Sequence, residues 1–242
     1  MGGPLSTVET FADTFVAPGR ALETAARERS VLPPLALAVA AALAFTAVLV
    51  PRADFERGAR EALDRAPPDE VQKMTPHEVE QALEQARKLG TVALYAGAVA
   101  GPPILALAMA TLLFAGFRVA GARPDFRPTL AVAAWGTLPL ALRDLLALPA
   151  LLAHGGVTPG EAGRLLPSSL LALAPAASAR AVPLLQSFDV FFLWSAALVA
   201  LGMAGVASTS RARAAAVVAF LFAAFVAVRF AVPGLLAGPP SQ

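Results

Sequence analysis

The chain has 242 residues, 57% of them hydrophobic and 15% charged, with a formal net charge of +2 and no cysteine. Ordinary soluble domains are about 45–50% apolar and about 25% charged, so this composition excludes an ordinary soluble domain. The lack of cysteine excludes disulfides and thiolate chemistry. The chain has only two histidines, which leave little for a metal site. Its basic residues are scattered, which excludes the dense basic face of a nucleic-acid-binding protein.

The first segment, residues 1–32, is predicted to be an amphipathic segment on the cytoplasmic side of a membrane. Ser6 and Glu9 have the spacing of a helix capping box, and the apolar side chains around them fall on one helical stripe. Pro18 ends this helix, and a short second helix leads to the first membrane span. We interpret the segment as lying on the cytoplasmic leaflet, with binding to a partner protein as the alternative.

Residues 33–50 form the first predicted membrane span, and residues 51–90 form a helical hairpin on the extracytoplasmic side. A span needs about 20 mostly apolar residues, because the hydrocarbon core is about 30 Å thick. In the hairpin, Thr75 and Glu78 have the spacing of a capping box for the second helix. That helix is predicted to end at Gly90, before the second span begins.

The second span, residues 91–117, contains two features that bear on packing. Gly97 and Gly101 are four residues apart, and small residues at this spacing let helices approach closely. We interpret them as a site of internal helix packing, with a dimer face as the alternative. Pro102 and Pro103 follow directly and predict a kink or an unwound turn in this helix.

Three further spans are predicted at residues 128–153, 188–207 and 212–232. Pro139 predicts a kink in the first of these. We interpret residues 154–187 as an interfacial or re-entrant loop on the outer face, and a sixth span at 165–185 is the alternative. The sequence therefore predicts an all-α, polytopic membrane protein with five transmembrane helices in one membrane domain.

The orientation of the chain follows from its basic residues, because cytoplasmic loops carry an excess of lysine and arginine near the ends of the spans. The basic residues at the predicted cytoplasmic ends include Arg20, Arg27, Arg123 and Arg211. This pattern places the N-terminus in the cytoplasm and the C-terminus on the extracytoplasmic side.

Four ionisable residues inside the predicted spans form the candidate site, because a charge within the bilayer is costly and commonly functional. They are Arg143, Asp144, Asp189 and Arg229, and counting along the helices places them at similar depth in the outer leaflet. The preferred interpretation is an ion-pair network that holds the spans together. The alternatives are a pocket for an ion, a solute or a lipid headgroup and, after these, catalysis by the two aspartates.

Several segments carry distinctive residues in a consistent order. The approach to the first span carries Phe15 and Pro18, and the third span carries Pro139. The segment from residue 185 to 218 contributes Asp189, Phe191, Trp194 and Gly202. Together these segments resemble the Yip-domain family of integral membrane proteins, named for members that bind Ypt/Rab GTPases. The resemblance implies a five-span, all-α protein with a cytosolic N-terminus, in agreement with the charge pattern.

The resemblance also implies a class of function. Eukaryotic members of the family act in vesicle traffic and membrane organisation, through Rab GTPases and self-association, whereas the alanine- and arginine-rich composition indicates the bacterial branch. We therefore expect a non-enzymatic protein of the bacterial inner membrane that acts as a scaffold in membrane organisation. The expected partners are membrane lipids, further copies of the chain and an unidentified membrane or cytoplasmic protein, with no nucleic acid, cofactor or metal. The alternative is a small transporter, channel or lipid-handling protein that uses the polar residues of the outer leaflet.

Overall fold

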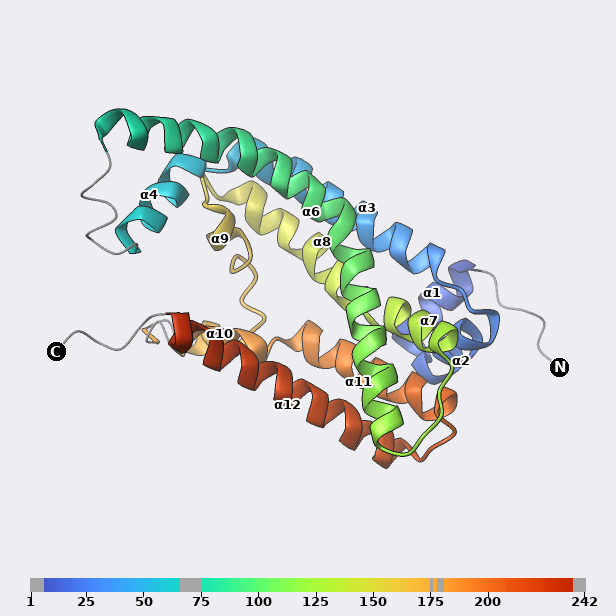
Figure 1. Ribbon diagram of the computed structural model, residues 1–242. Helices are drawn as coiled ribbons and strands as arrows, with labels where there is room; N and C mark the ends of the chain where they lie inside the picture. Colours follow the sequence, from blue (N-terminus) through green and yellow to red (C-terminus); the bar gives the residue numbers. More distant parts are fainter. Residues whose placement is uncertain (1–6, 66–74, 175, 178–180, 237–242) are drawn as a thin grey trace. The chain divides into compact units, whose positions relative to one another are not determined.

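The computed structural model describes residues 7–65, 75–174, 176–177 and 181–236, and every regular element in this part of the chain is a helix (Figure 1). The elements are α1 (Thr7–Val16), α2 (Pro18–Glu28), α3 (Leu32–Leu49), η1 (Val50–Arg52), α4 (Phe55–Arg65), α6 (Pro76–Val119), α7 (Phe126–Gly136), α8 (Leu138–Ala153), α9 (Pro159–Ala162), η2 (Leu170–Leu173), α10 (Val182–Ser187), α11 (Val190–Val206) and α12 (Arg211–Leu236). The predicted all-α class is confirmed. Ser6 of the predicted capping box lies outside the described residues.

Among the described residues, four helical segments are long and apolar enough to cross a membrane, namely Leu32–Arg52, His77–Val119, Phe126–Ala153 and Arg211–Arg229. The fourth predicted span corresponds to α11, which is apolar but has only 17 residues. Between Gly163 and Asp189 the described residues form only η2 and α10, of four and six residues. An element this short cannot cross a bilayer, so the described part of 165–185 holds no sixth span.

Helix α6 is a single helix of 44 residues, which corrects the prediction that a helix ends at Gly90. Gly90 lies inside this helix and does not end it. A Cβ at this position would lie 2.6 Å from the ring of Phe55. The glycine instead gives the Phe55 ring of α4 room against α6. The helix also continues through Pro102 and Pro103 without an unwound turn, as membrane helices can when local adjustments satisfy the carbonyls that the prolines leave free. The kink at these prolines stays a prediction.

The predicted cap at the start of α6 is confirmed. The Thr75 amide donates to Glu78 Oε2 at 2.6 Å, and the Glu78 amide donates to Thr75 Oγ1 at 3.3 Å. These reciprocal bonds satisfy two amides at the helix N-terminus that have no partner within the helix. The bond from the Thr75 amide also holds the pKa of Glu78 below its usual value.

The contacts divide the chain into two compact units, and each is described by itself. Unit 1 comprises residues 1–38, 103–141 and 167–242, and unit 2 comprises residues 39–102 and 142–166. Unit 1 holds α1, α2, α7, α11 and α12 and the C-terminal part of α6. Unit 2 holds α4, α9 and the N-terminal part of α6.

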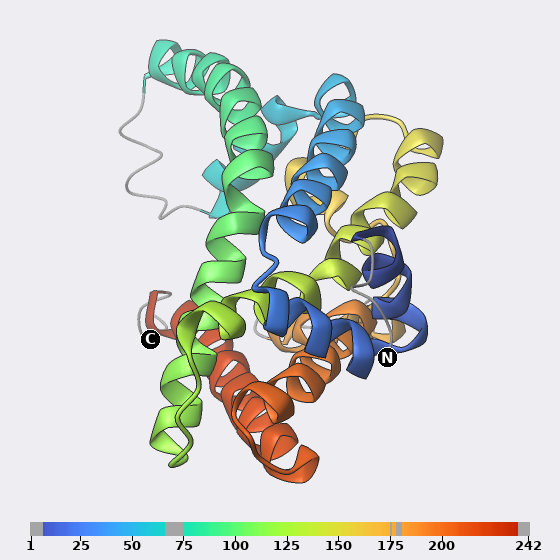
Figure 2. The ribbon, with the colours of Figure 1, turned by 90° about the vertical axis from the view of Figure 1, so that its right-hand side faces the viewer.

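The core of unit 1 forms where α2, α7 and α11 meet, as Figure 2 shows. Leu22 and Ala25 of α2 are fully buried in one cluster with Trp135 of α7 and Leu198 of α11. The indole Nε1–H of Trp135 donates to the carbonyl of Ser30 at 2.8 Å and so ties α7 to the end of α2. The N-terminal segment, predicted to lie on the membrane surface, therefore contributes α2 to the protein core.

The third predicted span consists of two helices, α7 and α8, that break at Thr137. Pro139 has no amide hydrogen, so it cannot make the helical bond to the carbonyl of Trp135. The Thr137 hydroxyl donates to the Ala134 carbonyl at 2.9 Å and satisfies an acceptor at the end of α7. The kink that Pro139 predicts is therefore present as a helix break.

Unit 2 has its own apolar cluster and a polar contact that links two of its helices. The buried members of the cluster are Leu49, Leu151, Val157 and Ala162. Outside it, Arg57 of α4 forms an ion pair with Glu161 of α9. Glu161 also accepts the amide of Thr158 at 2.8 Å as part of a capping box. This amide bond, with Arg57 adding to it, lowers the pKa of Glu161.

Candidate functional site

Arg143 and Asp144 of the predicted polar cluster are neighbours on α8 and bond to each other. Arg143 Nη2 donates to Asp144 Oδ1 at 3.2 Å. Both side chains are partly exposed, at 38% and 28%. The pair neutralises its own charges locally, which lowers the cost of placing either residue in an apolar helix.

Asp189 has a different role, because it is the N-cap residue of α11. Its Oδ1 accepts the amides of Phe191 at 2.9 Å and Phe192 at 3.2 Å, and its Oδ2 accepts the hydroxyl of Ser168. The side chain is nearly buried, with 7% of the residue exposed. A carboxylate at this position satisfies free amides and lies favourably at the positive end of the helix dipole.

Arg229 lies on α12 with its guanidinium 5.8 Å from the ring centroid of Phe225. Phe225 in turn stacks on Phe192 of α11 at 5.5 Å. This aromatic contact gives the cation a local partner within unit 1. A network that joins Arg229 and Asp189 to the pair on α8 remains a prediction.

The residues that carry the family resemblance gather in unit 1. Phe15 of α1 packs edge to face on Trp194 of α11, with ring centroids 5.4 Å apart. Pro18 is the first residue of α2. A Cβ on Gly202 would lie 2.6 Å from Cγ1 of Val132, so glycine at this position lets α11 approach α7 closely. These residues place α1, α2 and α7 around α11.

Gly97 and Gly101 lie on α6 in unit 2. A Cβ at either position would meet no atom within 4 Å, and Gly97 is exposed. The space beside this pair is therefore open in the described structure.

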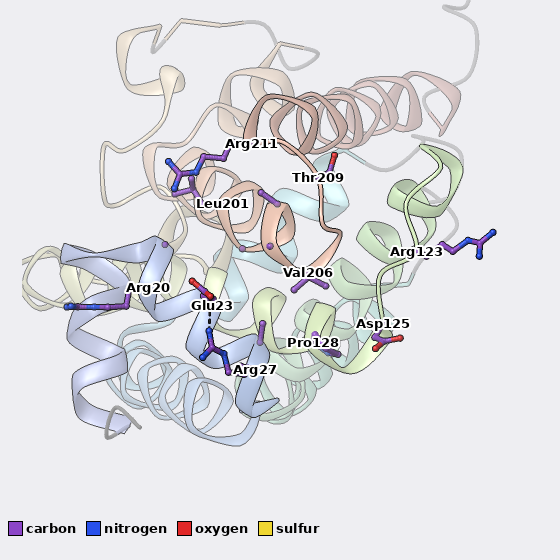
Figure 3. Close-up of a pocket in the computed structure, with 15 residues that line it drawn as sticks. Arg20, Glu23, Arg27, Arg123, Asp125, Pro128, Leu201, Val206, Thr209 and Arg211 are labelled. Carbon is purple, nitrogen blue, oxygen red and sulfur yellow. Dashed lines mark hydrogen bonds and ion pairs between the residues drawn. The ribbon is translucent and has the colours of Figure 1, made fainter. Parts of the chain in front are cut away.

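The sequence did not reveal a cavity of about 750 Å³ in unit 1, which Figure 3 shows in close-up. Its lining includes Arg20 and Arg27 of α2, Arg123 of the connection between α6 and α7, and Arg211 at the start of α12. We call it the basic cavity. From the sequence, these arginines only indicate the orientation of the chain in the membrane. Their spacing does not predict that three separate elements bring them to one cavity.

Two carboxylates in the lining, Glu23 and Asp125, partly offset the positive charge. Arg27 Nη2 pairs with Glu23 Oε1 at 2.8 Å. Arg20 pairs with Asp13 at 3.0 Å, and this carboxylate raises the pKa of Arg20. With four cations and two anions, the lining retains an excess of positive charge and is suited to an anionic ligand.

A metal centre finds no support in the described part of the chain, where no group of three or more histidine, aspartate or glutamate side chains is placed to hold an ion. The described side chains offer a positively charged lining at the basic cavity, an ion pair on α8 and a cation–aromatic contact on α12.

Comparison with known proteins identifies a family. A family model described as the Yip1 domain matches residues 12–232 of the chain. No curated protein and no solved structure matches the chain. The matched region contains α11, the residues packed around it and the whole lining of the basic cavity.

Proposed function

Because the chain belongs to the Yip1-domain family, we propose that this integral membrane protein has no enzymatic activity, self-associates and organises the membrane in which it lies. We place it in a bacterial inner membrane with its N-terminus in the cytoplasm and its C-terminus outside. The basic residues at the expected cytoplasmic ends support this orientation. Its proposed partners are membrane lipids, a second copy of the chain and a further membrane or cytoplasmic protein.

The observation that carries self-association is the open face of α6 at Gly97 and Gly101. A Cβ at either residue would meet no atom within 4 Å. Small residues four apart allow two helix backbones to come together in a bilayer, where van der Waals packing drives association. These features favour the dimer face over internal packing.

Cysteine crosslinking tests this proposal directly, because the chain has no native cysteine. Gly97→Cys and Gly101→Cys are expected to form disulfide-linked dimers when an oxidant is added to membranes that contain the full chain. The matched control is Val99→Cys, since Val99 is 52% exposed but lies about 200° around the helix from Gly97. Equal crosslinking at all three positions would show random collision and would contradict the proposed face.

A second candidate function is transport or lipid handling through the outer leaflet. It is favoured by the Arg143–Asp144 pair, which lies within a helical segment, Phe126–Ala153, that is long enough to span a membrane. Intramembrane ion pairs commonly mark the path of a solute or an ion. Solute flux or lipid transfer in proteoliposomes that is lost in Asp144→Asn would support this candidate in preference to the scaffold.

A further inference from the structure

We propose that the basic cavity is a binding site for the phosphate-bearing headgroup of an anionic phospholipid. The cavity has a volume of about 750 Å³ and is lined by Arg20, Arg27, Arg123 and Arg211. Arginine suits this ligand because its planar guanidinium can bond two phosphate oxygens at once. The inference goes beyond the proposed function and does not depend on self-association.

Two of the four arginines are available to a ligand. Arg20 is paired with Asp13, and Arg27 is paired with Glu23. The side chains of Arg123 and Arg211, by contrast, make no hydrogen bond or ion pair with any residue that the structure describes. Their charge is therefore the unpaired part of the lining, and Arg123, which extends outward from the rim, would have to turn inward to contact a bound phosphate (Figure 3).

The start of helix α7 contributes Asp125 and Pro128 to the lining of the same cavity. Asp125 occupies the N-cap position and lines the cavity, but its side chain makes no capping bond. Pro128 has no amide hydrogen and the amide of Thr129 donates to the carbonyl of Asp125 at 3.2 Å, so the arginines supply the charge that binds an anion here. The Asp125 carboxylate opposes a phosphate at close range, so the arginines have to outweigh it.

The shape of the cavity leaves room for a headgroup. Gly205 lies in its lining, and a Cβ at this residue would meet no atom within 4 Å. The four arginines are exposed and lie on different sides of the cavity (Figure 3). The side chains of Arg20 and Arg123 extend outward from its rim. An open basic site of this kind can receive a group that remains attached to a larger molecule.

The position of the cavity indicates a lipid as the source of that phosphate. The cavity lies where α11 ends and α12 begins, and both helices are strongly apolar. The ends of membrane helices lie at the level of the lipid headgroups, and basic pockets there on the cytoplasmic side bind anionic lipids. A lipid headgroup reaches this depth without leaving the bilayer, whereas a soluble phosphate would have to be concentrated from solution.

The test measures how much phosphatidylglycerol the full-length protein retains from nanodiscs that contain phosphatidylglycerol and phosphatidylcholine, by native mass spectrometry. The native chain is expected to retain phosphatidylglycerol preferentially. Arg123→Gln combined with Arg211→Gln is expected to lower this retention roughly tenfold or more, since each surface cation contributes substantially to binding of an anionic lipid. The matched control is Arg118→Gln combined with Arg127→Gln, which removes the same charge from exposed arginines nearby that do not line the cavity.

A second variant tests the site without changing its charge. Gly205→Phe fills the cavity from an unobstructed position and is expected to lower retention of phosphatidylglycerol, with the helix content by circular dichroism unchanged. Equal losses in the two arginine pairs would show diffuse surface attraction and overturn the site. Unchanged retention in both the Arg123/Arg211 and Gly205 variants would also overturn it. Titration with inorganic phosphate in phosphatidylcholine nanodiscs distinguishes the sources, because tight phosphate binding without preference for phosphatidylglycerol would contradict a lipid ligand.

Discussion

Asp189 shows how a charged residue can occupy the edge of a membrane helix for a local reason. Its carboxylate accepts two amides of α11 and the hydroxyl of Ser168, and it is nearly buried. These three donors satisfy most of its acceptor capacity within unit 1. The predicted ion pair with a distant arginine is therefore not needed to explain why an aspartate stands at this position.

Substitutions at Asp189 distinguish the cap from the ion-pair network. Asp189→Ala removes the cap of α11 and is expected to destabilise the protein by about 1–2 kcal/mol. Asp189→Asn retains a side-chain oxygen for the amides and is expected to cost clearly less. The measurement is thermal unfolding of the purified protein in detergent. If Asn costs as much as Ala, and Arg229→Gln costs a similar amount, the charge itself matters and the network gains support.

Helices α7 and α11 pack closely because a glycine of each helix faces a valine of the other. A Cβ on Gly136 would lie 2.5 Å from Cγ2 of Val199, and a Cβ on Gly202 would lie 2.6 Å from Cγ1 of Val132. Each glycine thus faces a valine of the other helix. Because valine is restricted at χ1, its methyl groups cannot easily turn away from an added side chain.

This fit predicts a coupled effect of two substitutions. Gly202→Ala is expected to cost about 1–3 kcal/mol of stability through overpacking. Val132→Ala in the same chain makes room for the new methyl group, so the double variant is expected to be more stable than the sum of the single effects predicts. Chemical unfolding in mixed micelles measures all four members of the cycle.

The control for this cycle is Gly205→Ala on the same helix, where a Cβ would meet no atom within 4 Å. It is expected to change stability little and to show no coupling to Val132→Ala. Additive effects of Gly202→Ala and Val132→Ala would mean that the close approach of α7 and α11 does not limit this position.

The helices themselves could be predicted from the sequence, whereas their contacts could not. Apolar runs of sufficient length identify a membrane helix wherever it occurs, and Thr75 with Glu78 marks the start of α6 by purely local bonds. Gly90 was wrongly predicted as a helix end because a glycine that ends a helix and one that admits an aromatic ring look alike in sequence. Only the position of Phe55 decides between them.

At the scale of the whole molecule, composition determines the class of protein but not the site. A chain that is 57% hydrophobic and 15% charged has to place much of its surface in lipid. The basic cavity depends instead on α2, the α6–α7 connection and the start of α12 meeting at one place. The sequence does not predict that arginines about a hundred residues apart come together. Each of them alone is an ordinary basic residue at the cytoplasmic end of a membrane span.

The topology rests on α11, which is the shortest of the proposed spans. Its 17 residues rise about 25 Å, somewhat less than a hydrocarbon core of about 30 Å. A helix this short can still cross when the bilayer thins locally or flanking residues reach to the interface, at a modest cost. The arginines at the start of α12, Arg211 and Arg213, favour a cytoplasmic position for the turn that follows α11.

Labelling of single cysteines on the two sides of α11 tests this crossing. Gly163→Cys lies at an exposed position before α11, and Ser210→Cys lies at an exposed position after it. In intact cells, a membrane-impermeant maleimide is expected to label Gly163→Cys and to leave Ser210→Cys unlabelled, whereas permeabilised cells should show both. Labelling of both in intact cells would mean that α11 does not cross, and labelling of Ser210→Cys alone would invert the chain. Either result would also move the basic cavity away from the cytoplasmic leaflet, because Ser210 directly precedes Arg211 in its lining.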